Sequence, residues 1–110
     1  MTNNSDLIAN LHISQILVGL DLGEKTIGIA VSDQSLIIAT PLKTILRKGI
    51  KKDLIKLSEA LKEYNIGGFV IGLPISLDGT ENQQTSKVMK IANEIKNYFS
   101  FRHHMVVCFL

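Results

Sequence analysis

The chain has 110 residues, of which 45% are hydrophobic and 20% charged, and its formal net charge is +2. A chain of this length accommodates one domain with a single core, which excludes an enzyme built from two lobes around a cleft. Its single cysteine, Cys108, excludes an internal disulfide and fits a reducing compartment. The polar N-terminus lacks the basic and apolar regions of a secretory signal, so we expect residues 1–15 to form a mobile tail.

The N-terminal half predicts three strands. Residues 16–22 (ILVGLDL) are apolar apart from Asp21, which is typical of a central strand covered on both faces. Residues 27–31 are close enough to fold back on them as a hairpin, and residues 36–45 form a third strand. Because the proline ring cannot donate to a ladder, Pro41 predicts that the third strand lies at an edge of the sheet.

The rest of the chain predicts helices alternating with strands. A helix over residues 50–64 ends at the glycine-containing residues 65–68, and residues 69–73 form a buried strand. A second helix begins near Thr80, which has a glutamine at capping-box spacing, and residues 105–110 form the last strand. The apolar stripe of the first helix comprises Ile50, Leu54, Leu57, Leu61 and Tyr64, and that of the second comprises Val88, Ala92, Ile95 and Phe99.

This order of elements predicts an α/β fold with a mixed sheet. A helix between two strands is the usual crossover that makes the strands parallel. Three antiparallel strands followed by helix, strand, helix and strand form the layout of the ribonuclease H-like fold.

Asp21 is the candidate functional residue, and Gly19 and Gly23 lie two positions away on either side. A charged carboxylate in an apolar strand is unfavourable unless it is paired, hydrogen-bonded or bound to a metal. Carboxylates that bind Mg²⁺ support phosphodiester hydrolysis, and flanking glycines let a phosphate approach. The alternative is structural, with Asp21 accepting hydrogen bonds from the following turn and Lys25 as a partner.

Other polar residues give weaker signals. Asp33 and Asp78 follow strands and could approach the same sheet edge, although turn roles are more common for such residues. His103 and His104 are adjacent and would point to opposite faces of a strand, so we interpret them as surface residues. Cys108 lies in an apolar run and is interpreted as a core residue. A basic segment, typical of a solvated face or a phosphate-binding patch, comprises Lys43, Arg47, Lys48, Lys51, Lys52 and Lys56.

Three motifs in a fixed order carry a resemblance to a known family: LVGLDLGEKTIGIAVSD, ATPLKTI and FVIGLPISLDGTENQQ. Over about residues 16–99 the chain resembles the YqgF/RuvX family of pre-16S ribosomal RNA nucleases, which are related to Holliday-junction resolvases. The resemblance implies a ribonuclease H-like nuclease domain over residues 16–110 and a bacterial cytoplasmic location. It also implies a Mg²⁺ or Mn²⁺ cofactor and, as substrate, the 5′ end of pre-16S rRNA or other structured or branched nucleic acid.

The resemblance also assigns roles to individual residues. Asp21 matches the catalytic, metal-binding aspartate of the family's first strand. Substrate-side roles are implied for Gly19, Gly23, Lys25, Asp78 and Gly79. Further matches to the motifs are Gly28, Asp33, Gly72 and Pro74.

The resemblance departs from the family after Phe99, where the chain reads SFRHHMVVCFL. Family members continue into an aspartate-glutamate-arginine motif and a final helix with another acidic residue. By resemblance, the chain is therefore a C-terminally truncated version of the fold that lacks the final helix and has one of the catalytic carboxylates. A lone carboxylate holds Mg²⁺ poorly.

Two alternatives to a nuclease remain open. In the first, the domain binds nucleic acid through its lysine-rich segment without cleaving it, and in the second it is an inactive remnant of the family. An actin-like or sugar-kinase ATPase, in which D-x-G forms a phosphate loop, is excluded because such enzymes need two lobes around the nucleotide.

Overall fold

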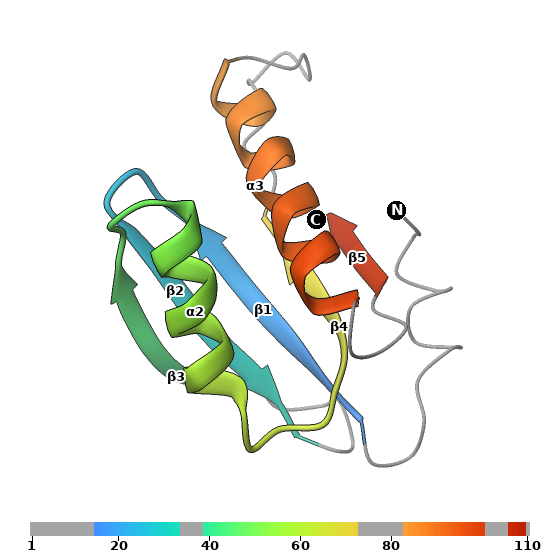
Figure 1. Ribbon diagram of the computed structural model, residues 1–110. Helices are drawn as coiled ribbons and strands as arrows, with labels where there is room; N and C mark the ends of the chain where they lie inside the picture. The colour runs from blue at the N-terminus through green and yellow to red at the C-terminus, as the bar shows by residue number, and fades with distance from the viewer. Residues whose placement is uncertain (1–14, 34–38, 73–82, 101–105, 110) are drawn as a thin grey trace.

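The computed structural model describes residues 15–33, 39–72, 83–100 and 106–109. Five strands and two helices lie in these ranges (Figure 1). In chain order they are β1 (Ile16–Leu22), β2 (Thr26–Ser32), β3 (Ala39–Leu46), α2 (Ile50–Leu61), β4 (Ile66–Ile71), α3 (Gln83–Ser100) and β5 (Val106–Phe109). The predicted tail lies outside the described residues except for Gln15.

The strands form one mixed sheet in the order β3-β2-β1-β4-β5. The first three pair antiparallel, whereas β4 runs parallel to both β1 and β5. This confirms the predicted mixed sheet. The position of β3 at the edge is also confirmed, and Pro41 lies in it opposite Ala30, where the register of the β2–β3 pair shifts.

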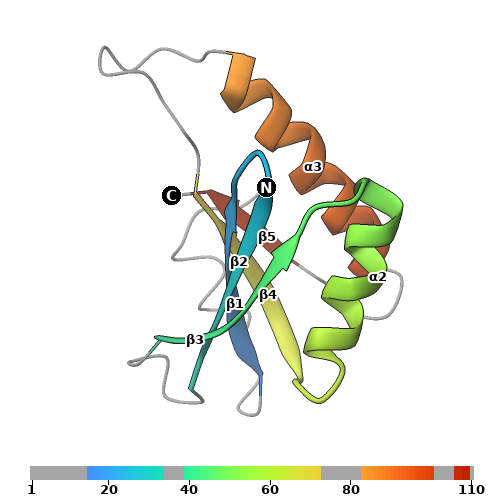
Figure 2. The ribbon, with the colours of Figure 1, turned by 90° about the vertical axis from the view of Figure 1, so that its left-hand side faces the viewer.

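Both described helices lie on the same face of the sheet (Figure 2). The period-two alternation of the strands turns one set of side chains toward these helices, so that in β1 Ile16, Val18, Leu20 and Leu22 are all buried. On the opposite face of β1, Leu17 and Gly19 are half-buried and Asp21 is exposed. The prediction that β1 is covered on both faces is therefore not met within the described part of the chain.

The core lies between the sheet and the helices. Leu54, Leu57 and Leu61 of α2 are buried there, as the apolar stripe predicted. All four predicted core residues of α3 are buried as well, and Phe99 packs against Phe69 of β4 with ring centroids 4.9 Å apart.

Several predicted boundaries were wrong. The helix α2 ends at Leu61, and Tyr64 lies in the following turn with 36% of its surface exposed, because the chain turns at residues 62–65 to enter β4. The strand β4 begins at Ile66, not residue 69, and Ile16 donates a backbone hydrogen bond to Asn65 where β4 starts to pair with β1. Parallel pairing in the centre of the sheet outweighs the low strand preference of the two glycines in β4.

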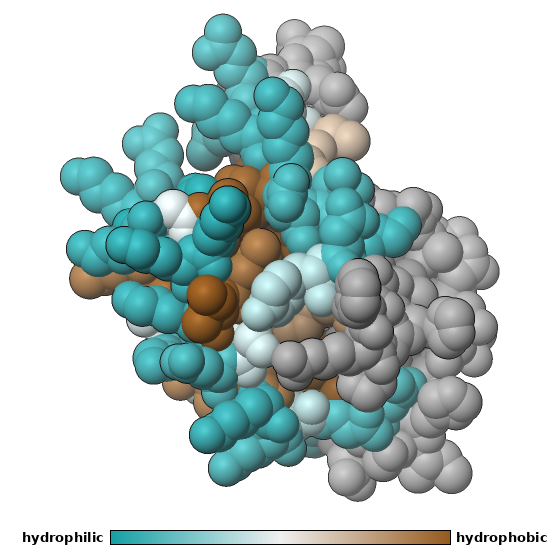
Figure 3. All heavy atoms as spheres, in the orientation of Figure 1, coloured by the Kyte–Doolittle hydropathy of each residue, from teal (hydrophilic) through white to brown (hydrophobic). Residues whose placement is uncertain are grey.

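The ends of other elements lie outside the described residues. Thr80, the predicted N-cap of the second helix, and Pro74 are among these residues, and so is the start of the third predicted strand. In the part of the chain that is described, hydrophilic side chains predominate on the outer surfaces of α2 and α3, and hydrophobic groups lie between them (Figure 3). Ile55 on α2 and Met89 on α3 are among the exposed hydrophobic residues. Neither of these helices combines the length and the apolar character needed to cross a membrane.

Candidate active site

Asp21 lies on the face of the sheet opposite the two helices. It is the sixth residue of β1, and its Cα pairs with that of Gly28 in β2. Its neighbours Leu20 and Leu22 point into the core, so Asp21 projects from the open face and is exposed. The carboxylate is therefore not buried, and the strand places it in water at the C-terminal end of β1.

Glycines lie near Asp21 in β1 and β2 and directly after β4. A Cβ atom on Gly28 would lie 3.6 Å from the Cβ of Asp21, and one on Gly19 would meet only Ala30 at 4.0 Å. At Gly72, directly after β4, no atom of the described residues lies within 4 Å of such a position. Side chains are thus missing on both sides of the carboxylate, which leaves room for a bulky ligand.

The space left by these glycines is a hollow of about 580 Å³ on the open face. Its floor is β1 and β2, and its sides are β3 and the end of β4. The lining residues are Gly19, Leu20, Asp21, Gly28, Ile29, Ala30, Pro41, Leu42, Lys43, Thr44, Val70 and Gly72. Lys43 is the basic residue of this lining, so the hollow combines one carboxylate, one ammonium group and an apolar floor.

No described residue forms a hydrogen bond or ion pair with the Asp21 carboxylate. The structural alternative, in which the following turn or Lys25 holds Asp21, is therefore not seen within the described ranges. Lys25 is exposed in the β1–β2 turn, and its backbone carbonyl accepts a 2.8 Å hydrogen bond from the amide of Arg47. Asp21 is left free to bind something that is not part of these residues.

Gly23 has a role in the turn. Its amide donates to the carbonyl of Thr26 at 2.9 Å, and a Cβ atom on Gly23 would lie 3.2 Å from that same oxygen. This contact is tighter than ordinary packing, so glycine allows the turn to close. Of the two glycines that flank Asp21 in sequence, only Gly19 lies in the hollow.

Of the remaining candidates, Asp33 lies within the described residues and the others lie outside them or have no described side chain. Asp33 follows β2 at the opposite end of the sheet, five residues beyond Gly28, which corresponds to roughly 16 Å along an extended strand. The sequence left open that Asp33 and Asp78 approach the same sheet edge and favoured a turn role for each. Antiparallel pairing sends the end of β2 to the beginning of β1, so Asp33 lies at the end of the sheet away from Asp21. Asp78, Gly79, Pro74, His103 and His104 lie outside the described residues, as does the side chain of Cys108.

Sequence reasoning missed a buried carboxylate, Asp53, which is 1% exposed in the first turn of α2. Its Oδ1 accepts a 2.8 Å hydrogen bond from the amide of Lys48, and its Oδ2 lies 3.7 Å from Nε of Arg47. Nη1 of Arg47 donates at 2.7 Å to the carbonyl of Gly23. Gly49, with φ of 117°, lies between Arg47 and Asp53 and provides the bend that brings the chain into α2. The position of Asp53 as the one acid among six bases was a signal for this contact.

The described residues would hold a metal ion only together with ligands from the substrate or water. Within them, no three His, Cys, Asp or Glu side chains are grouped to hold an ion. Mg²⁺ typically retains several waters and takes one or two carboxylates together with substrate phosphates. Asp21, exposed in an open hollow, suits one such position.

Comparison with known proteins identifies relatives across most of the chain. Residues 15–107 match the RuvX family, described as Holliday junction resolvase. A relative from Thermoanaerobacter pseudethanolicus is 43% identical over 84 residues, which are 76% of this chain and 60% of the relative. One from Rhodobacter capsulatus is 44% identical over 91 residues, which are 83% of this chain and 57% of the relative. Both are named "Putative pre-16S rRNA nuclease", and the chain spans about three fifths of their length.

A solved structure confirms the fold. The chain matches T. thermophilus RuvC, solved in complex with a Holliday junction substrate, with a TM-score of 0.60 at 14% identity over 87% of this chain and 64% of RuvC. A likeness at this identity shows a shared fold, which is ribonuclease H-like as the order of elements predicted. The match over residues 15–107 shows that the chain belongs to the RuvX family.

Proposed function

We propose that this protein is a metal-dependent nuclease that acts on structured nucleic acid in the bacterial cytoplasm, with the 5′ end of pre-16S rRNA as its substrate. The observation that carries the proposal is the exposed Asp21 carboxylate, which has no hydrogen-bond or ion-pair partner among the described residues and lies in a hollow lined in part by glycines. The names of the family and of its relatives, which refer to a resolvase and to pre-16S rRNA nucleases, support the substrate class.

The hollow suits the approach of a phosphodiester. A nucleic-acid backbone is wide and strongly hydrated, and side chains at Gly19, Gly28 or Gly72 would keep it away from Asp21. Lys43 on the wall of the hollow offers an ammonium group to a phosphate oxygen. Asp21 pairs with Gly28 of β2, and the preceding residue, Leu20, also pairs with Ile71 of β4. The strand therefore holds the backbone next to the carboxylate in place, and little reorganisation is needed when substrate binds.

Asp21 would hold Mg²⁺ or Mn²⁺ together with the substrate phosphate. When bound, such an ion polarises the phosphoryl oxygen and lowers the pKa of a bound water. Asp21 contributes the negative charge that draws the ion to the open face, and the glycines contribute space. We also propose substrate-side roles for Lys25, in the turn that follows β1, and for Asp78 and Gly79, which lie outside the described residues.

The test is cleavage of a labelled pre-16S rRNA 5′ fragment, and of a four-way DNA junction, in Mg²⁺ by the full chain. Asp21→Asn keeps the shape of the side chain and removes the charge. The cleavage rate should fall by at least about 100-fold, since even residues that only support metal ligands cost 10- to 100-fold when changed. Chelation with EDTA should stop cleavage, and Mn²⁺ should restore it.

Glu63→Gln is the matched control, because it removes one carboxylate from an exposed position in the turn after α2. Its cleavage rate should equal that of the unchanged chain. Full activity of Asp21→Asn, with a circular dichroism spectrum like that of the parent, would show that Asp21 is not the metal-binding carboxylate and would reject the proposal.

A second candidate function is supported by the basic segment. Lys51, Lys52 and Lys56 are exposed on α2, and Lys43 is exposed on β3. These side chains suit sequence-independent contact with phosphates, without any need for Asp21. Binding that weakens steeply with salt and is not followed by cleavage in Mg²⁺ would favour this function over the nuclease.

A further inference from the structure

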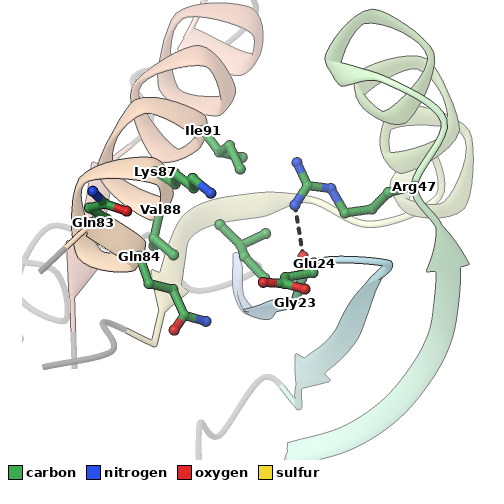
Figure 4. Close-up of a pocket in the computed structure, with 9 residues that line it drawn as sticks. Gly23, Glu24, Arg47, Gln83, Gln84, Lys87, Val88 and Ile91 are labelled. Carbon is green, nitrogen blue, oxygen red and sulfur yellow. Dashed lines mark hydrogen bonds between the residues drawn. The ribbon is translucent and has the colours of Figure 1, made fainter. Parts of the chain in front are cut away.

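A second cavity lies on the helix side of the sheet, close to the same end of β1. It has a volume of about 420 Å³ and is bounded by the β1–β2 turn, Arg47 and the first turns of α3 (Figure 4). Its lining residues are Leu22, Gly23, Glu24, Arg47, Gln83, Gln84, Lys87, Val88 and Ile91. We call this cavity the Arg47 cleft. Leu22 lines it, while the preceding residue, Asp21, lines the hollow on the other face, so one strand end separates the two sites.

Arg47 is held in position at two of its nitrogen atoms. Nη1 donates to the carbonyl of Gly23 at 2.7 Å, and Nε lies 3.7 Å from Oδ2 of Asp53. The Arg47 side chain is 23% exposed and Asp53 is 1% exposed, so the contact is largely shielded from water. Oδ2 of Asp53 has no hydrogen-bond partner within the described residues, and its charge is balanced by Arg47.

The contacts of Arg47 leave part of its guanidinium group available. No hydrogen bond within the described residues uses Nη2. In Figure 4 the guanidinium group projects from its own segment toward the space in front of α3. A planar cation whose orientation is already fixed loses less entropy when it binds an oxyanion, which favours phosphate recognition.

The α3 side of the cleft supplies a second cation and two amides. Gln83 and Lys87 are four residues apart, so they lie on the same face of the helix, and Gln84 is next to them. All three are exposed. Glu24 is the acidic residue in the lining, so the cleft has two cations and one carboxylate. Amide groups and cations arranged in this way are typical contacts to the phosphates and sugars of a polynucleotide.

We propose that the Arg47 cleft binds a backbone phosphate of the nucleic-acid strand whose neighbouring segment lies in the Asp21 hollow. The proposal rests on the proposed function, because it concerns the same substrate. Asp21 and Gly23 are two residues apart, roughly 7 Å along the chain, and each strand of a duplex carries a phosphate about every 3.4 Å along its axis. One strand that passes over the end of β1 can therefore reach both sites.

Binding of labelled nucleic acid tests this assignment without cleavage. Fluorescence anisotropy in EDTA measures the affinity of the full chain for a four-way DNA junction and for the pre-16S rRNA 5′ fragment. Lys87→Ala should weaken binding about fivefold and reduce the slope of log affinity against log salt by about one. The matched control is Lys90→Ala, which removes the same charge from an exposed position one turn along α3 that does not line the cleft. Its effect should be less than about twofold.

A substitution that should tighten binding, where Lys87→Ala should weaken it, provides a second test. Glu24→Gln removes the carboxylate from the cleft and should tighten binding about twofold, with a steeper salt dependence. Arg47→Lys keeps the charge but loses the planar fork, so it should weaken binding more than Lys90→Ala does. Because Arg47 also holds the turn, Lys87→Ala and Glu24→Gln are the decisive variants.

Equal effects of Lys87→Ala and Lys90→Ala would overturn the proposal, and so would unchanged or weaker binding by Glu24→Gln or no measurable binding by the parent chain. Displacement of the labelled junction by micromolar AMP or inorganic phosphate would indicate a free small ligand and would also overturn it. Failure of the nuclease proposal is a separate result, because it would appear as cleavage that persists in Asp21→Asn. That result would leave the comparison of Lys87→Ala with Lys90→Ala unchanged.

Discussion

The two faces of the central strands differ sharply in how deeply their side chains are buried. On the face toward the helices, Val18 and Phe69 have no exposed surface and pack in the core. On the other face, their sequence neighbours Gly19 and Val70 are half-buried and line the Asp21 hollow. Because a strand alternates its side chains with a period of two, one segment can stabilise the fold and present the candidate site. Substitutions at adjacent residues should therefore separate stability from activity.

The largest expected effect is on stability, at adjacent residues of β4. Phe69→Ala removes a ring that is fully buried and packs at a tilt against the ring of Phe99, so it should lower the free energy of unfolding by about 3–5 kcal/mol. Val70→Ala removes two methyl groups from the half-buried open face and should cost about 1 kcal/mol or less. Urea unfolding followed by circular dichroism measures both values.

Similar losses at the two positions would contradict this comparison. They would mean that the open face is packed as tightly as the helix side in the folded protein. Phe69→Leu, which keeps most of the apolar volume, should fall between the two alanine variants and provides a folded reference if Phe69→Ala does not fold.

A smaller effect, on activity alone, is expected at Gly28 on the open face. A Cβ atom there would lie 3.6 Å from the Cβ of Asp21, which is ordinary contact, so Gly28→Ala should fold normally. The two further methyl groups of Gly28→Val would extend into the hollow and displace a phosphate. Cleavage of the pre-16S fragment should fall by about tenfold or more, since misplacement by 1 Å can cost 100-fold.

The stability of Gly28→Val should stay the same or rise, because valine is favoured in strands and glycine is not. Thermal unfolding by circular dichroism provides that control. Unchanged cleavage by Gly28→Val would indicate that substrate does not enter the hollow beside Asp21, while a lower melting temperature would assign any loss of activity to folding.

The parts of this structure that follow local patterns were predictable from the sequence. The apolar run of residues 16–22 placed Asp21 in the first strand, and the helical stripe identified Leu54, Leu57 and Leu61 as core residues. Pro41 indicated the edge strand for a purely local reason, its missing amide donor. The mixed sheet of the ribonuclease H-like fold followed from the order of the elements along the chain and the crossover rule.

Features that depend on distant contacts were not predictable in the same way. Two glycines of β4 lie in a strand because β1 pairs with them, which no local propensity indicates. Asp53 contacts Arg47, which in turn reaches the turn after β1, 24 residues earlier in the chain. The basic segment was visible in the sequence, but the fixed position of its one arginine, Arg47, beside a cleft required the three-dimensional structure.

The smallest effect is expected at Asp33, the other aspartate of the first motif. It lies beyond β2 at the far end of the sheet, roughly 16 Å along the strands from the level of Asp21. Ligands of Mg²⁺ lie about 2.1 Å from the ion, so the two carboxylates cannot share one. Asp33→Asn should therefore change the cleavage rate by less than about twofold, in the assay in which Asp21→Asn should lower it by at least about 100-fold.

Asp33 has contacts of its own, so Asp33→Asn can affect stability, and the cleavage rate is compared at a temperature where both proteins are fully folded by circular dichroism. A loss in the folded variant comparable to that of Asp21→Asn would mean that catalysis uses both ends of the open face. The candidate site would then extend along the whole length of β1 and β2, and the glycine-lined hollow would be only one part of it. Retained activity would instead confine the chemistry to the end of β1, where Asp21, the hollow and the Arg47 cleft meet.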